Sequence, residues 1–450
     1  MLTPRQLRER LDERFHLLAG GRRDALPRQQ TLRALIDWSY DLLDVRERTL
    51  FRRLGVFVNG FMFDGAAAVG SDEGLDELDV FDVLSSLVDK SLVLAEPQVD
   101  GVRYRLLEST HAYAVAKLDD AGERDLVASR HLKYLRDHFA EVRAWRERTT
   151  GRPDLVAALQ TELEDVRLAL DGALDRSALI DGAELLANID TSWRAVGLNV
   201  DGRVWCEAYL EALPVSERRL RARLLIVLSH LLDASGHSLR ALELATEVVE
   251  HAYADGDASL LARALHRYAD AAISRGQLDE AERALARAEA IPGISVHVRN
   301  RMLGARAQLS QLRGQLEVAV RMYERLRKEC RALGDTFGEQ AAAGCLAETE
   351  HALGQTQRAA AIVRETLPEA RGGTDKGMLA KLLQNLAGYL AATDDLPAAA
   401  AAASEAIEIH AAREPDHADI ATAIEHLALV IALRANVARA AVLEGYADAA

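Results

Sequence analysis

Leucine and alanine recur every three or four positions through most of the second half of the chain, as on one face of an α-helix. The stripe is clear at Leu225, Leu228 and Leu232, and it recurs at Leu383, Leu386 and Leu390. This pattern predicts a series of amphipathic helices whose apolar faces are buried against neighbouring helices.

A short motif divides these helices into units of about 40 residues. In four copies a glycine is followed five positions later by alanine, Asp394 replaces the glycine in a fifth, and weaker copies stand at both ends. The anchors are Gly197, Gly236, Gly276, Gly314, Gly354, Asp394 and Ala435, spaced by 39, 40, 38, 40, 40 and 41 residues. Each unit is predicted to be two helices joined at the anchor, where glycine takes the left-handed conformation.

Small residues stand seven positions before the five central anchors, at Ser229, Ala269, Ala307, Ala347 and Ala387. A small side chain at one fixed place in every unit predicts a close crossing of its two helices. The pattern resembles the tetratricopeptide repeat, with a longer unit and therefore longer helices. We expect an α-solenoid over residues 185–450. The alternative is a helical bundle whose glycines are spaced by chance.

The first part of the chain has a different pattern. Amphipathic helices are predicted at 30–43, 45–57, 64–69 and 79–90, followed by a hairpin with strands at 92–96 and 102–107. Helices followed by a two-stranded wing are typical of a winged-helix domain, expected at 27–115. A helical connector is expected at 116–184, so the fold class is mainly α.

Four strings in this first part carry a family resemblance: ERFHLLAGGRRDALPRQQTLRALIDWSYDLL from Glu13, RTLFRRLGVF from Arg48, LVDKSLV from Leu87 and RYRLLES from Arg103. They resemble the bacterial STAND-class signalling ATPases, closest to the AfsR-like transcriptional regulators. That family joins a P-loop ATPase domain, a small helical domain, a winged helix and a tetratricopeptide sensor. The resemblance implies that residues 1–26 are a remnant of the small helical domain.

The chain departs from that family where nucleotide would bind. No G-x-x-x-x-G-K-[ST] stretch occurs, and GGTDKGM from Gly372 lacks its spacing and context. Many relatives carry a phosphate-sensing histidine after the wing, and Leu107 occupies that place here. His111 stands where relatives commonly carry arginine. We therefore expect no ATPase activity and no cofactor.

Other chemistry is equally absent from the sequence pattern. Cys206, Cys330 and Cys345 are far apart and form no C-x-x-C pair, and the 13 histidines do not cluster as metal ligands. The N-terminus lacks the apolar core of a signal peptide, and no apolar stretch is long enough to span a bilayer. These features predict a cytoplasmic protein without a metal or catalytic site.

Charge argues against DNA as the partner. The chain carries −15, and residues 1–130 hold 18 Arg and Lys against 23 Asp and Glu. The candidate recognition helix, 79–90, has three aspartates and one lysine, which phosphates would repel. Arg103 and Arg105 on the wing are the local argument for DNA contact.

Polar residues at matching helix positions predict a binding surface inside the repeat array. They are Arg223, His230, Arg263, His266, Asp270, Arg301, Gln308, Glu348, Lys381 and Gln384. The basic excess in an acidic chain favours an acidic or carboxylate-ended ligand. The alternative is an ordinary solvated helix surface.

The sequence thus predicts a non-catalytic regulatory protein that senses a peptide, a protein or a small effector through its repeats. Two alternatives stay open. The chain could be a DNA-binding transcriptional regulator acting through the winged helix, or a fragment of a full-length signalling ATPase whose start codon was assigned internally.

Overall fold

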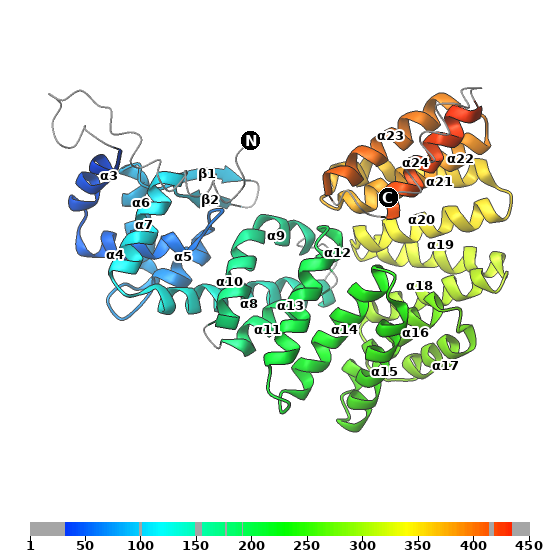
Figure 1. Cartoon of the computed structure of the whole chain (residues 1–450), viewed down its shortest axis with the longest axis horizontal. Coiled ribbons are helices and arrows are strands. Elements are labelled where there is room, and N and C mark those ends of the chain that lie inside the picture. The colour runs from blue at the N-terminus through cyan, green and yellow to red at the C-terminus, as the bar shows by residue number, and fades with distance from the viewer. Residues whose placement is uncertain are drawn as a thin grey trace. The chain divides into compact units, whose positions relative to one another are not determined.

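The computed structural model describes residues 32–98, 101–148, 155–175, 178–190, 192–413 and 418–433. These residues are mainly helical, with one two-stranded antiparallel sheet (Figure 1). The chain forms two compact units. The first comprises residues up to Asp137 with Glu162–Asp181, and the second comprises His138–Thr161 and the residues from Gly182 onward. The predicted connector is divided between the two units, and the predicted remnant at 1–26 lies outside the described residues.

The first unit consists of short helices and a hairpin around an aromatic core. Its elements are α3 (Leu32–Asp41), α4 (Val45–Arg53), the 3₁₀ turn η2 (Leu54–Val56), α5 (Phe63–Gly70), α6 (Glu77–Asp89), β1 (Leu94–Gln98), β2 (Gly101–Arg105), α7 (Glu108–Asp120), the first part of α8 (Arg124–Arg148) and α10 (Leu163–Asp175). Phe51, Phe57 and Phe61 are fully buried among its helices. The helices and hairpin follow the predicted order.

The hairpin differs from the prediction in its bounds. The first strand was expected at 92–96, but the N–H groups of Leu92 and Val93 donate to the carbonyl of Leu87 and close the end of α6. Both side chains are buried, so the strand begins at Leu94. The second strand ends before Leu107, because that residue is the N-cap of α7.

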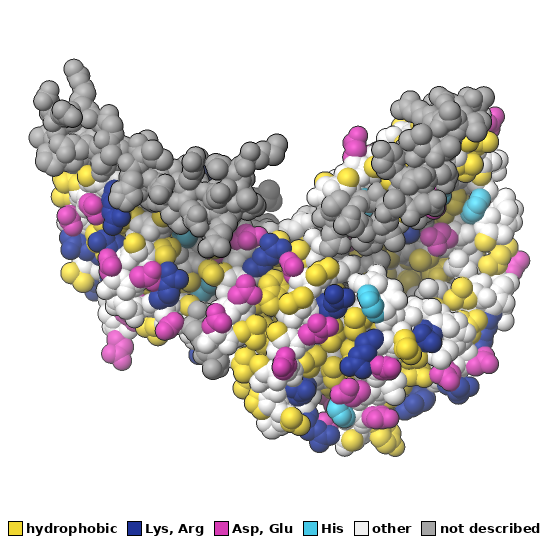
Figure 2. Space-filling view, in the orientation of Figure 1, with side chains coloured by type: hydrophobic (Ala, Val, Ile, Leu, Met, Phe, Trp, Pro, Cys, Tyr) yellow, Lys and Arg dark blue, Asp and Glu magenta, His cyan; other side chains and the backbone are white. Residues whose placement is uncertain are grey.

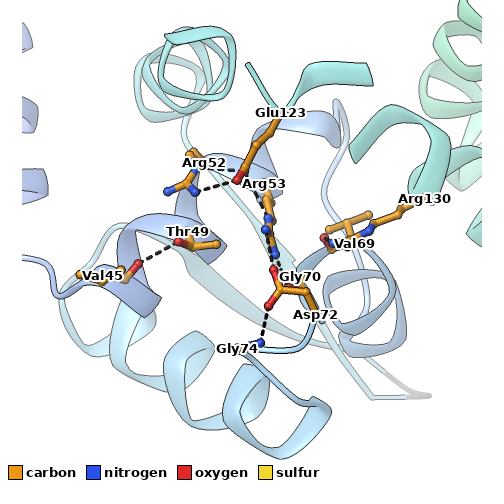
Figure 3. A network of polar contacts seen from close by, with 10 residues as sticks. All are labelled: Val45, Thr49, Arg52, Arg53, Val69, Gly70, Asp72, Gly74, Glu123 and Arg130. Atoms are coloured by element: carbon orange, nitrogen blue, oxygen red, sulfur yellow. Dashed lines mark hydrogen bonds and ion pairs between the residues drawn. The ribbon is translucent and has the colours of Figure 1, made fainter. Parts of the chain in front are cut away.

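The arginines of the first unit are used to hold its elements together (Figure 3). The guanidinium groups of Arg52 and Arg53 both contact Glu123, and Arg53 also reaches Asp72 and the carbonyl of Gly70. The hydrogen bond from Arg52 lowers the pKa of the Glu123 carboxyl against the opposing effect of burial. These groups therefore stabilise the fold, and the guanidinium groups of Arg52 and Arg53 are both engaged in ion pairs.

The second unit is an array of helices that pack against their neighbours in chain order (Figure 1). Besides the end of α8, it contains α9 (Leu155–Thr161), most of α11 (Leu179–Ile189), α12 (Ser192–Ala195), α13 (Asn199–Ala212), α14 (Arg218–Ala234), α15 (Ser238–Ala254), α16 (Ala258–Ser274), α17 (Leu278–Glu289), α18 (Val296–Leu312), α19 (Leu316–Ala332), α20 (Thr336–Ala352), α21 (Thr356–Gly372), α22 (Lys376–Ala392), α23 (Leu396–Arg413) and α24 (Ala418–Leu433). Many of these helices have 17 residues, which fits a unit of about 40.

The predicted anchors are the turns between paired helices. Gly236, Gly276, Gly314 and Gly354 have φ between +72° and +81°, and Asp394 adopts the same left-handed region at +63°. After each anchor, an N–H donates back to a carbonyl five residues earlier, as from Gln277 to Ala272 at 2.9 Å. This bond closes the C-terminus of the first helix. The last predicted anchor, Ala435, lies outside the described residues.

The small residues predicted at the helix crossings are fully buried. Ser229, Ala269, Ala307, Ala347 and Ala387 are each 0% exposed. The hydroxyl of Ser229 donates to the carbonyl of Ala241 on the paired helix at 2.8 Å, so the two helices are close enough for a side chain to reach the neighbouring backbone. The array is an α-solenoid of tetratricopeptide-like helix pairs.

Candidate functional site

A pocket rich in positive charge lies on the array, where α14, α16 and α18 meet the parts of α8, α9 and α11 that belong to the same unit. The empty space between its residues is about 650 Å³ when the open solvent at its mouth is included. The lining residues, here called the cationic pocket, are Arg143, Leu155, Asn188, Asp190, Ile226, His230, Arg263, His266, Arg267, His297, Val298 and Arg301. On the face drawn in Figure 2, basic, histidine and acidic side chains are interspersed over the helices of the array.

The repeat places one basic residue at the same position in three successive pairs. Arg223, Arg263 and Arg301 each stand thirteen positions before the turn glycine of their unit. Because α14, α16 and α18 are the first helices of those pairs, equivalent positions recur along the array. Arg263 and Arg301 line the pocket, and Arg223 lies beside it on α14.

The C-terminal end of α11 supplies the acceptors for this row. Arg223 Nη2 donates to Asn188 Oδ1 at 2.7 Å, and Arg263 Nη2 lies 3.3 Å from Asp190 Oδ2. Arg143 Nη1 donates to the carbonyl of Ala187 at 2.7 Å. Burial lowers the pKa of Arg223 to about 10, and the like charges of Arg143 and Arg263 add to that effect. Basic groups are thus crowded together against few acids.

Arg267 forms a separate, charge-balanced cluster at the base of the pocket. Its side chain is 6% exposed, and its Nη2 donates to Asp233 Oδ2 at 2.8 Å. Its Nη1 donates to His230 Nδ1 at 2.9 Å and lies 3.1 Å from Asp270 Oδ2. Two carboxylates therefore compensate this guanidinium, which ties α14 to α16.

His266 faces the same cluster from the neighbouring position on α16. Its Nδ1 lies 3.5 Å from Asp270 Oδ2. Burial is the main cause that lowers the pKa of His266 to about 4 despite that carboxylate, and Arg301 and Arg267 contribute to the same shift. The imidazole is therefore neutral near pH 7 and can donate or accept a hydrogen bond without adding charge.

The structure brings together only part of the predicted row. His230, Arg263, His266 and Arg301 line the pocket, Arg223 adjoins it, and Asp270 is a partner of its base. Gln308 is on α18 but is exposed outside the lining. Three others lie farther along the array: Glu348 accepts from Asn385 at 2.8 Å, Lys381 is exposed, and Gln384 is 1% exposed beneath the final helices. None of these four lines the cationic pocket.

Several lining residues escaped sequence reasoning. Arg143 precedes the predicted repeats, and Asn188 and Asp190 fall in their weak first copy, so no regular periodicity points to them. Arg267 and His297 belong to repeat helices but occupy helix positions other than those of the predicted row. Arg263 and Arg267 are one helical turn apart, and this spacing is the sequence feature that could have predicted a basic face on their helix.

The two residues aligned with the family's nucleotide-sensing positions have structural roles here. Leu107 is exposed and caps α7 with an extended backbone. His111 is directed at the backbone of Gly55 and Phe57, and burial lowers its pKa. Neither side chain is part of the cationic pocket.

Neither a metal site nor a membrane-spanning helix is present among the described residues. Across the described ranges, no group of three or more His, Cys, Asp and Glu is placed to hold a metal ion. None of the described helices has the length and hydropathy needed to cross a bilayer.

The chain resembles parts of larger proteins. It is 39% identical over 210 residues to a Mycobacterium tuberculosis protein named "Putative HTH-type transcriptional regulator Rv0890c", a match that covers 47% of this chain and 24% of the relative. It is 41% identical over 144 residues to "Uncharacterized protein Rv0894" of the same species, covering 32% of this chain and 37% of that protein. The chain thus spans about a quarter of the length of the regulators it matches. No known family model matches it.

Among solved structures, the chain is similar to a STAND protein with a tetratricopeptide repeat sensor from Pyrococcus horikoshii. The identity is 15% and the TM-score 0.44, with 100% of this chain and 69% of that chain covered. A TM-score below 0.5 does not establish a shared fold, so this likeness adds nothing to what the helix pairs themselves show.

Proposed function

We propose that this chain is a non-catalytic regulatory protein whose repeat array binds an effector in the cationic pocket. The name of the mycobacterial relative supports a regulatory role. The observation that carries the proposal is that the pocket draws its lining from three consecutive helix pairs. A ligand bound there contacts α14, α16 and α18 at once and so couples binding to the spacing of the repeats.

The proposal assigns no catalytic step to the chain. The sequence has no phosphate-binding loop, and the His230 and Arg267 side chains of the pocket are occupied by structural contacts. Binding, rather than turnover, is the chemistry that these groups support.

The test is an equilibrium dialysis of the purified chain against a bacterial metabolite extract, with retained compounds identified by mass spectrometry. We expect the wild-type chain to enrich a specific compound, and the Arg263→Ala, Arg301→Ala double variant to lose it. The matched control replaces exposed arginines of the same unit, Arg240 on α15 and Arg325 on α19, with alanine. Enrichment of nothing, or equal enrichment by both double variants, would refute the proposed function.

DNA binding is the second candidate, because the relative is named as an HTH-type regulator. The first unit supports it poorly. Arg103 is directed inward at Glu162, 2.9 Å away, with side-chain exposures of 11% and 9%. Arg105 pairs with Glu96 within the hairpin. Both wing arginines are thus engaged with carboxylates of the same unit.

A further inference from the structure

We propose that the effector is a small organic dianion, which carries two negative charges on a partly apolar body. The inference rests on the proposed function and names the class of ligand for that same pocket. A phosphate monoester and a dicarboxylate both meet this description, and the experiment below separates them.

The first step is the number of charges. Among the residues that the structure describes, Arg223 donates to a neutral amide and Arg301 has no carboxylate at ion-pair distance. Both side chains are part-buried, and Asp190 is the one carboxylate of the lining. Arg223 interacts with the carboxylates of Asp190 and Glu184 only beyond ion-pair distance. Two arginines that form no ion pair call for two negative charges, because a buried charge is costly until it is paired.

The second step is the kind of contact these arginines can make. A guanidinium presents several N–H donors in a planar fork, which matches the oxygens of a carboxylate or a phosphoryl group. The neutral imidazole of His266 adds a hydrogen-bonding group beside Arg301 without adding positive charge, and the half-buried His297 adds a second imidazole to the lining. His297 is positioned by Asp335, whose Oδ2 lies 3.7 Å from its Nδ1.

The third step is the organic body. Leu155 and Ile226, each 5% exposed, and the part-buried Val298 form an apolar wall within the lining. A ligand with its charges at the arginines can therefore bury carbon atoms against this wall.

The charge balance also sets an upper limit. Asp190 lies 3.3 Å from Arg263 within the pocket and repels further negative charge. Arg267 is already compensated by Asp233 and Asp270, so it offers no additional net charge. A long polyanion, such as an acidic peptide, would have to leave most of its charges without a partner.

The experiment is calorimetric titration of the full chain, in phosphate-free buffer, with matched probes. Phenyl phosphate is compared with benzoate, which has the same ring and one charge, and glutarate is compared with butyrate. We expect at least one dianion to bind about tenfold or more tightly than its monoanionic counterpart. The better of the two dianions identifies the phosphoryl or the dicarboxylate source.

Variants locate the binding. Arg301→Gln and Arg223→Gln should each weaken the preferred dianion about tenfold, and Arg301→Lys should recover part of the loss because it restores the charge. Arg240→Gln, on exposed α15 surface, should leave the affinity unchanged. Thermal midpoints measured for each variant identify any loss that comes from unfolding.

Three results would overturn the inference: equal affinity for dianion and monoanion, binding that ignores Arg223 and Arg301, or no binding of any dianion. A hexaglutamate peptide that binds more than tenfold tighter than glutarate would also overturn it in favour of an acidic peptide. If dialysis retains a neutral compound that the Arg263→Ala, Arg301→Ala variant loses, the proposed function stands while the dianion inference fails.

Discussion

Burial and partners give four basic residues of the array different roles. Arg263 and Arg267 stand one turn apart on α16, yet Arg267 is held by two carboxylates and a histidine, whereas Arg263 faces the pocket with Asp190 beside it. His266, between them, is kept neutral by its surroundings. Arg301, on α18 of the next helix pair, forms no ion pair among the described residues.

Arg267→Ala should destabilise the array, while Arg301→Ala should leave its stability nearly unchanged. Removing Arg267 leaves Asp233 and Asp270, with side chains 13% and 22% exposed, without their cation. Breaking such a buried pair costs about 3 kcal/mol, whereas Arg301→Ala should cost about 0.5 kcal/mol or less. Urea unfolding followed by circular dichroism measures both. Equal losses for the two variants would mean that the cluster around Arg267 is not structural.

His266→Gln should flatten the acid branch of the stability curve. Because the folded pKa is about 4 and the ordinary value is 6.5, the unfolded chain binds the extra proton between these pH values. The free energy of unfolding therefore falls as pH drops from 6.5 to 4, by up to about 3 kcal/mol from this residue. Unfolding measured at several pH values should show a smaller fall in the variant.

The control for this titration is His237→Gln, since His237 is exposed at the start of α15. Its stability curve should keep the wild-type shape. The charged groups that face His266 are Asp270 and Arg267 on its own helix and Arg301 on α18. If the free energy of unfolding falls equally at low pH in the wild type and in His266→Gln, burial does not lower the pKa of His266 as described.

At the scale of elements, glycines serve two distinct purposes. Gly236 stands in a turn with φ +79° and open space around it, so glycine is required there for its backbone conformation and not for lack of room. Gly182, within α11, has no room for a side chain: a Cβ there would lie 2.2 Å from the hydroxyl oxygen of Tyr209. Tyr209 is itself fully buried, so neither partner can easily move away.

Gly182→Ala should therefore destabilise the second unit by about 2 kcal/mol through overpacking. Tyr209→Phe removes the nearest atom, so the double variant should recover part of that loss in a double-mutant cycle. Gly236→Ala should cost about 1 kcal/mol through backbone strain and show no coupling to Tyr209→Phe. Coupling at both glycines, or at neither, would contradict this distinction.

The elements that sequence predicted are those set by local periodicity. The left-handed turns at Gly276 and Asp394 and the buried alanine at 347 follow from a repeated short motif. Only part of the pocket can be predicted in this way, because Arg143 and Asn188 reach it through the tertiary packing of helices that the regular repeat does not include. Gln384 shows the converse: its repeat position suggested a groove, but packing of α22 with α24 buries it.

At the scale of the whole molecule, the cationic pocket is a site of excess positive charge within an acidic chain. The net charge is −15, and the first unit binds its arginines internally, as with Arg52 and Arg53 at Glu123. On α6, Asp82 and Asp89 are exposed, where a DNA-reading helix would carry basic or amide side chains. The distribution therefore favours a small anion in the array over a nucleic acid on the first unit.

The chain should accordingly give no sequence-specific retardation of promoter DNA at about 0.15 M salt, because phosphate neutralisation supplies most of the binding free energy and α6 opposes it. Replacing both exposed aspartates, Asp82→Lys with Asp89→Lys, should create salt-sensitive DNA binding and so demonstrate that charge is the limiting factor. Arg103→Ala should lower the thermal midpoint instead, since it leaves Glu162 buried without its cation. A sequence-specific mobility shift of DNA by the wild-type chain, abolished by Arg105→Ala at an unchanged thermal midpoint, would instead assign DNA reading to the hairpin. Arg105, the hairpin arginine that is directed at the surface, would then have to exchange Glu96 for a phosphate.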